Sequence, residues 1–182
     1  TPSSTYEYNM KTGETKLLKQ QEVLGGTFDS KNYISERIWA NSRDGKVKIP
    51  ISLVYHKDTP KSAETPLLLY GYGSYGHTID ASFSNVRLSS LDRGFIYAIA
   101  HVRGGEYLGR EWYDNGKMLK KKNTFFDFID VAKFLISENY TSHKHLYAMG
   151  GSAGGLLMGA VMNYEPEIFN GIVAQVPFVD VV

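Results

Sequence analysis

The chain has 182 residues, which is enough for one ordinary domain with a hydrophobic core and a small piece of a second. Its composition is that of a globular protein. A net charge of +1 gives no basis for binding nucleic acid or an anionic membrane surface, and no apolar run approaches the roughly 18 residues of a membrane span. The absence of cysteine excludes a disulfide framework, a thiolate nucleophile and a cysteine-based zinc site, and it fits a reducing compartment such as the cytoplasm.

The segment before Tyr33 predicts a β-hairpin. Residues 5–10 alternate in polarity, residues 11–14 form a turn, and the alternation resumes over 15–19. Because a lone hairpin is only marginally stable in water, this one is expected to need a larger sheet. Two glycines at 25–26 then indicate a turn or hinge.

From Tyr33 onward the pattern is that of an α/β fold with a mostly parallel central sheet. Two alternating strands are expected over 35–40 and 47–55, around a turn at 43–45. Continuous apolar runs further along are typical of strands that are buried on both faces of a parallel sheet. These runs cover residues 67–70, 95–100, 146–149 and 172–174.

Two helices are expected between these strands. Apolar residues that recur at helical spacing form one stripe, which predicts a helix ending near Glu138. The stripe comprises Phe125, Phe128, Ile129, Ala132, Leu135 and Ile136. Thr124 and Asp127 resemble a capping box at its start, with Asp in place of Glu, and the basic run at 117–122 is interpreted as a solvated surface before the helix. The second helix is expected from Ala153 to Asn163.

A G-x-S-x-G motif, at Gly150, Ser152 and Gly154, lies between the third apolar run and the second helix. In a nucleophile elbow the serine lies on a strained strand-to-helix turn, and the residues two positions before and after it have no room for side chains. The helix N-terminus favours developing negative charge, and the N–H of Ala153 is a candidate oxyanion donor. The alternative is a glycine-rich turn without chemistry. A phosphate-binding loop is disfavoured because no Lys-Ser/Thr pair follows the glycines.

Two other strand ends carry polar residues on the side where open α/β sheets bind ligands. Tyr72 lies in a turn of glycines and tyrosines, and its hydroxyl is either a second oxyanion donor or part of a turn with packing aromatic rings. His101, Arg103 and Glu106 follow the next apolar run. The simplest interpretation of this second group is an Arg–Glu pair that fixes the loop.

A serine nucleophile needs a base oriented by a carboxylate, and in this kind of fold the chain order is Ser, then Asp or Glu, then His. Every histidine precedes Ser152; they are His56, His77, His101, His143 and His145. Of the downstream acids, Asp180 is expected to cap a loop rather than to complete a triad. The chain is therefore either a fragment of a longer enzyme or a domain with another role. The isolated hairpin and the apolar run at 178–182 favour a fragment.

The combined motifs resemble the prolyl oligopeptidase family of serine peptidases, and within it the oligopeptidase B type. The resemblance covers nearly the whole chain from Glu36 onward, and alanine at position 153 in place of asparagine favours the oligopeptidase B type. It rests on residues 70–73 (YGYG), 103–105 (RGG), 120–125 (KKKNTF), 150–155 (GGSAGG) and 174–182 (AQVPFVDVV).

This resemblance implies that residues 29–182 are the N-terminal part of an α/β-hydrolase domain, and that residues 1–28 are the end of a β-propeller and a hinge. It implies cleavage of short peptides after Arg or Lys through an acyl-enzyme, without a cofactor. Ser152 would be the nucleophile, with Tyr72 and the Ala153 N–H as oxyanion donors. The triad Asp and His would lie in the missing hydrolase segment. That segment and the rest of the propeller would be the partners of this chain.

The chain departs from the oligopeptidase B pattern at two places. An Asp-x-Asp pair, linked in that type to a second basic residue of the substrate, is reduced here to Asp80, which is the expected substrate-binding residue. Glu106 lies in a variant motif and is given no role. The alternatives are a carboxylesterase or acylaminoacyl peptidase of the same fold, or a binding domain without a triad. Because no base follows Ser152, the chain by itself is expected to be inactive.

Overall fold

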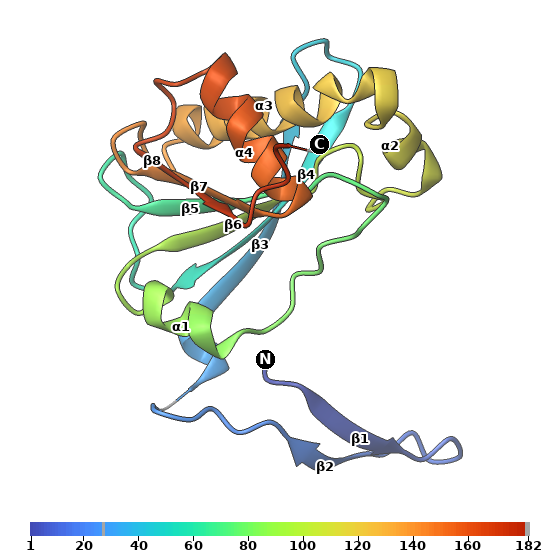
Figure 1. Ribbon diagram of the computed structural model, residues 1–182. Helices are drawn as coiled ribbons and strands as arrows, with labels where there is room; N and C mark the ends of the chain where they lie inside the picture. The colour runs from blue at the N-terminus through green and yellow to red at the C-terminus, as the bar shows by residue number, and fades with distance from the viewer. Residues whose placement is uncertain (27, 181–182) are drawn as a thin grey trace.

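The computed structural model describes residues 1–26 and 28–180, which form a two-stranded hairpin and a six-stranded sheet (Figure 1). In the hairpin, β1 (Ser4–Tyr8) pairs antiparallel with β2 (Thr15–Gln20), as predicted. The larger sheet has the strand order β3-β4-β6-β5-β7-β8. Its strands are β3 (Tyr33–Asn41), β4 (Lys48–His56), β5 (Leu67–Tyr70), β6 (Ile96–Ala100), β7 (Leu146–Gly151) and β8 (Gly171–Gln175). Of the apolar run predicted at 178–182, Val181 and Val182 lie outside the described residues.

The six-stranded sheet is mixed. β3 pairs antiparallel with β4, and β4 pairs antiparallel with β6, whereas β6, β5, β7 and β8 are parallel to one another. The continuous apolar runs therefore form the parallel half of the sheet, and the two alternating strands form the antiparallel half. The carboxyl ends of β6, β5 and β7 meet at one edge, which is where ligand-binding loops of such sheets lie.

Helices cover both faces of the larger sheet. α3 (Lys122–Ser137) and α4 (Ala153–Tyr164) lie over one face, and α1 (Asn85–Leu91) lies over the other (Figure 1). The two long helices match their predictions to within a few residues. The short elements are too brief to show a period in the sequence. They are α1, α2 (Arg110–Asp114) and the 3₁₀ turns η1 (Ser30–Asn32) and η2 (Met118–Lys120).

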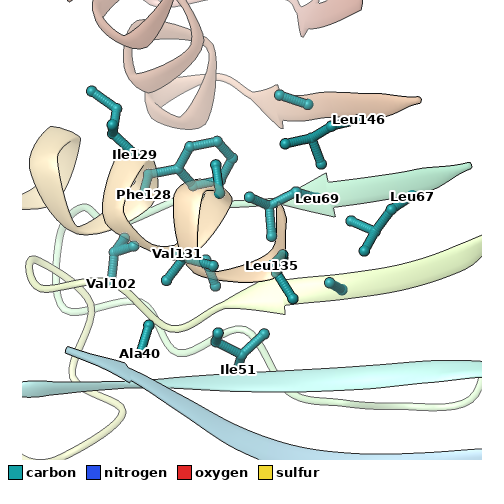
Figure 2. Close-up of a cluster of buried hydrophobic side chains, with 14 of the residues drawn as sticks. Ala40, Ile51, Leu67, Leu69, Val102, Phe128, Ile129, Val131, Leu135 and Leu146 are labelled. Carbon is teal, nitrogen blue, oxygen red and sulfur yellow. The ribbon is translucent and has the colours of Figure 1, made fainter. Parts of the chain in front are cut away.

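The main hydrophobic core fills the space between the sheet and α3 (Figure 2). Alternate strand residues point to opposite faces, so Leu67 and Leu69 of β5 pack in this core, while Leu68 packs in a smaller cluster on the other face. Phe128 of α3 is fully buried, and a Cβ built at Gly71 would lie 2.6 Å from its ring. Phe128 thus joins the core to the loop that follows β5.

Truncation of Phe128 should be costly because it leaves a cavity that the surrounding strands and helix cannot close. We expect Phe128→Ala to lower the free energy of unfolding by about 3–5 kcal/mol, measured by urea denaturation. Leu119→Ala is the matched control, since Leu119 is fully exposed and its truncation should change stability by less than about 0.5 kcal/mol. Equal effects of the two substitutions would contradict this assignment of the core.

The start of α3 differs from the prediction. The helix begins at Lys122, so Thr124 and Asp127 lie inside it and do not form a capping box. The Thr124 hydroxyl instead donates to the carbonyl of Arg103 at 2.6 Å. The basic run before α3 is also not a wholly solvated surface, because Lys121 is partly buried and donates to the loop after β5. At this end of α3, Thr124 and Lys121 bind neighbouring loops instead of capping the helix.

The hairpin lies apart from the six-stranded sheet, and within the described residues it shares no strand pairing with that sheet (Figure 1). Its apolar side chains are exposed, including Tyr6, Tyr8, Leu17 and Leu18. That it belongs in a larger sheet stays a prediction. Among the described residues, no helix has both the length and the apolar character to cross a membrane.

Candidate active site

Ser152 lies on the sharp turn between β7 and α4 with φ 54° and ψ −117°, a conformation that is uncommon for a residue with a side chain. Hydrogen bonds from the neighbouring segment fix this turn. The Ser152 N–H donates to the carbonyl of Gln175 at 3.0 Å, and the Ser152 carbonyl accepts from the Phe178 N–H at 2.9 Å. The Ser152 side chain is nevertheless exposed. The backbone is therefore strained and fixed at an exposed serine.

The glycines around Ser152 are required by close backbone approach. A Cβ built at Gly150 would lie 2.4 Å from the Gly154 carbonyl oxygen, and one built at Gly154 would lie 2.7 Å from the Gly71 carbonyl oxygen. A Cβ at Gly155 would lie 2.5 Å from the Cα of Pro177. The steric reason predicted for Gly150 and Gly154 is thus present in the structure.

Ala153 is buried and is the first residue of α4. N–H groups in the first turn of a helix have no partner within the helix and favour negative charge. Within residues 1–26 and 28–180, the Ala153 N–H donates to no acceptor. It is therefore available to an anion next to Ser152.

Tyr72 lies against the first turn of α4. A Cβ built at Gly154 would lie 3.4 Å from both the Cα and the Cδ2 of Tyr72, which brings this loop beside the Ser152 turn. The Tyr72 ring also packs edge-on against His77, with 5.3 Å between ring centroids. Its hydroxyl forms no hydrogen bond in the described part of the chain. An open hollow of about 520 Å³ adjoins it, lined by Tyr70, Tyr72, Tyr75, Gly76, His77, Thr78 and Ile79.

His101 is not available to Ser152. Its Nε2 lies 2.7 Å from the Ser52 hydroxyl oxygen, its ring stacks on Tyr107 at 3.8 Å, and it is 4% exposed. Burial, reinforced by the positive charge of Arg37, lowers the pKa of His101 to about 4, so the imidazole is neutral at pH 7. Its neutral ring therefore contacts Ser52 and Tyr107.

Arg103 also has a structural role, with a different partner from the one predicted. It pairs with Asp127 and not with Glu106, so the Arg–Glu interpretation is wrong. The Arg103 Nε lies 2.8 Å from Asp127 Oδ2, the Nη2 lies 2.6 Å from Oδ1, and the Arg103 N–H donates to Oδ2 at 3.0 Å. Glu106 instead lies 3.9 Å from Arg110, within its ion-pair range. A carboxylate among the apolar residues of α3 was the one sequence signal for the Asp127 pair.

Asp80 is exposed and follows directly on Ile79, the last residue lining the hollow beside Tyr72. Its carbonyl accepts from the Ser82 N–H at 2.8 Å. Its carboxylate forms no hydrogen bond or ion pair with the residues that the structure describes. The substrate-binding role of Asp80 stays a prediction, as does the loop-capping role of Asp180.

The family model described as the prolyl oligopeptidase family matches residues 81–182. The chain belongs to the prolyl oligopeptidase family. It is 56% identical over its full length to dipeptidyl aminopeptidase BI of Pseudoxanthomonas mexicana, covering 25% of that protein. It is 48% identical to protease 2 of Moraxella lacunata, covering 26% of it. These relatives support the resemblance to serine peptidases of this family.

Solved structures of the prolyl oligopeptidase family match the fold closely. Oligopeptidase B from Leishmania major has a TM-score of 0.91 and 49% identity, over 99% of this chain and 25% of that one. Oligopeptidase B from Trypanosoma brucei, in a closed form with covalently bound antipain, has a TM-score of 0.91 and 50% identity, with the same coverage. The chain thus spans about a quarter of the length of the relatives it matches.

Alanine substitutions at two glycines of α4 test how closely the turn at Ser152 is packed. Alanine is favoured over glycine by about 1 kcal/mol inside a helix. A Cβ at Gly159 would meet nothing within 4 Å, whereas a Cβ at Gly154 would collide with the Gly71 carbonyl. We expect Gly159→Ala to keep or raise stability, and Gly154→Ala to lower the free energy of unfolding by about 1–3 kcal/mol. Chemical denaturation of both variants measures this, and a stabilising Gly154→Ala would disprove the close approach.

Proposed function

We propose that Ser152 is the nucleophile of a serine peptidase of the prolyl oligopeptidase family. The observation that carries the proposal is the strained, exposed turn at Ser152, which is bonded on both sides and has no room for side chains at Gly150 or Gly154. Backbone strain of this kind costs about 1–3 kcal/mol and persists only where the surroundings fix it. A turn without chemistry would have no need of such a conformation at a serine.

In the proposed reaction, the Ser152 Oγ attacks the carbonyl carbon of the scissile peptide bond while a base takes the hydroxyl proton. The oxyanion of the tetrahedral intermediate accepts hydrogen bonds from the Ala153 N–H and the Tyr72 hydroxyl. Collapse breaks the C–N bond, the amine leaves with the proton from the base, and an ester to Ser152 remains. Water then hydrolyses that ester by the same steps.

The base and its carboxylate are proposed to lie outside these 182 residues. The buried, Ser52-bonded state of His101 supports this, because that histidine is already engaged and cannot act on Ser152. The relatives are about four times as long as this chain, which leaves ample sequence for both groups. By the chain order of the fold, they would follow Ser152.

We also propose a domain organisation for the chain. Residues 29–182 would be the N-terminal part of an α/β-hydrolase domain, with Ser152 on its nucleophile elbow. Residues 1–28 would be the end of a β-propeller and the hinge to the hydrolase domain. The separation of the exposed hairpin from the six-stranded sheet supports this division.

The substrates are proposed to be short peptides with Arg or Lys before the scissile bond, as in the oligopeptidase B type. Identity of 49% and 50% to two oligopeptidase B structures supports this, and the exposed carboxylate of Asp80 is suited to contact a basic side chain. A second candidate is removal of dipeptides from a free N-terminus, favoured by the 56% identity to a dipeptidyl aminopeptidase. Turnover of a chromogenic Arg peptide with a blocked N-terminus favours the first, and turnover only with a free N-terminal dipeptide favours the second.

Removal of the Ser152 hydroxyl is the primary test. In the complete gene product, we expect Ser152→Ala to abolish turnover of a chromogenic Arg peptide. We also expect the wild-type protein, but not the Ser152→Ala variant, to form a covalent antipain adduct that mass spectrometry locates on Ser152. Ser142→Ala is a control at a serine away from the motif. We also expect the 182-residue chain alone to be inactive; turnover by this chain that Ser152→Ala abolishes would refute the external base.

The Tyr72 hydroxyl is tested by Tyr72→Phe in the complete gene product. Loss of one oxyanion donor should lower kcat by about 10²-fold or more, with little change in KM, because the hydrogen bond forms in the transition state. Tyr75→Phe is a matched control, since Tyr75 lies in the same loop and is exposed. Steady-state kinetics measure both variants, and an unchanged kcat would remove Tyr72 from the site.

A further inference from the structure

Lys121, just before α3, has an unusual environment for a lysine. Its Nζ donates to the Gly73 carbonyl at 2.5 Å and to the Ser74 hydroxyl at 2.7 Å. Its ammonium also lies 5.9 Å from the centroid of the Phe125 ring. It forms no ion pair with any residue in 1–26 or 28–180. Lys117, in the same basic run, by contrast pairs with Asp114 in the ordinary way.

This placement of Lys121 is costly. Burial lowers its pKa from the ordinary value to about 8, because the protonated amine loses hydration without gaining a carboxylate partner. The cation also lies at the N-terminal end of α3, where the helix dipole disfavours positive charge. A partly buried cation without a counter-ion is often a sign of a functional site.

The two acceptors of Lys121 belong to the loop that carries Tyr72. Gly73 and Ser74 directly follow Tyr72, and Ser74 is 8% exposed. Gly73 has φ 69°, and a Cβ built on it would lie 2.3 Å from the Thr124 Cγ2. The loop is therefore seated on the first residues of α3, and Lys121 supplies its charge-assisted hydrogen bonds, which are about twice as strong as neutral ones.

We infer that Lys121 is a positioning residue for Tyr72. By donating to the Gly73 carbonyl and to Ser74, it fixes the conformation of residues 72–74, so that the Tyr72 hydroxyl is held in place for the oxyanion beside Ser152. This inference rests on the proposed function. A misplacement of about 1 Å can cost about 10²-fold in rate, so a side chain that fixes this loop contributes to catalysis without touching the substrate.

Lys121→Met in the complete gene product tests the inference, because it keeps a long aliphatic side chain and removes the donor. We expect kcat to fall about tenfold to a hundredfold, by no more than Tyr72→Phe lowers it, while KM stays within about twofold. Lys122→Met is the matched control, since Lys122 is the exposed neighbour on α3 and its variant should keep wild-type kcat.

A double-mutant cycle separates positioning from a general structural role. If Lys121 acts through Tyr72, the variant with both Lys121→Met and Tyr72→Phe should have nearly the kcat of Tyr72→Phe alone. Lys121→Leu, which also lacks a donor, replaces Lys121→Met in the cycle if the methionine variant does not fold, as judged by its thermal unfolding.

Two results would overturn the inference: a folded Lys121 variant with wild-type kcat, or single effects that multiply in the double variant. Ser152→Ala distinguishes its failure from that of the proposed function. If Ser152→Ala retains turnover, the proposed function itself is wrong. If Ser152→Ala is inactive and Tyr72→Phe lowers kcat, but Lys121→Met keeps the wild-type kcat, only the role of Lys121 is wrong.

Discussion

The close contact between two backbone turns is the constraint on which the rest of the site depends. The carbonyl of Gly71, at the end of β5, approaches the turn between β7 and α4 so closely that neither Gly150 nor Gly154 has room for a side chain. This contact aligns the loop after β5 with the first turn of α4. It follows that backbone packing brings Tyr72, Ser152 and the Ala153 N–H together.

The N-terminal part of α3, with Lys121 just before it, supports this arrangement. Asp127 binds the guanidinium and the backbone N–H of Arg103, and the Thr124 hydroxyl donates to the Arg103 carbonyl. Lys121 binds the neighbouring loop through Gly73. One helix end thus organises the loops after β5 and β6, which are consecutive along the chain and adjacent in the sheet. Breaking a buried pair such as Arg103–Asp127 typically costs about 3–5 kcal/mol, so these loops share the stability of the core.

Much of the fold could be predicted from periodicity, because long apolar patterns report burial directly. The runs at 67–70 and 146–149, the stripe on α3 and the glycine spacing around Ser152 each correspond to an observed element. Partner choice could not be predicted. Arg103 had an acid three residues away, yet it binds Asp127, which is distant in sequence. Among the carboxylates that the structure describes, only that of Asp127 is buried beside Arg103. Lys121 was likewise one of several lysines, and nothing local distinguished it from its solvated neighbours.

The hydrogen bonds that Ser152 makes with Gln175 and Phe178 bear on the order of folding. Neither bond can form until β8 has paired with β7, and the approach of Gly71 to Gly154 joins segments that are far apart along the chain. Contacts of such long sequence separation form slowly, after the loop-closure entropy has been overcome. We therefore expect the strained turn at Ser152 to form late in folding. A nascent or partly folded molecule would carry Ser152 without this strained turn, so the proposed reaction would depend on completion of the sheet.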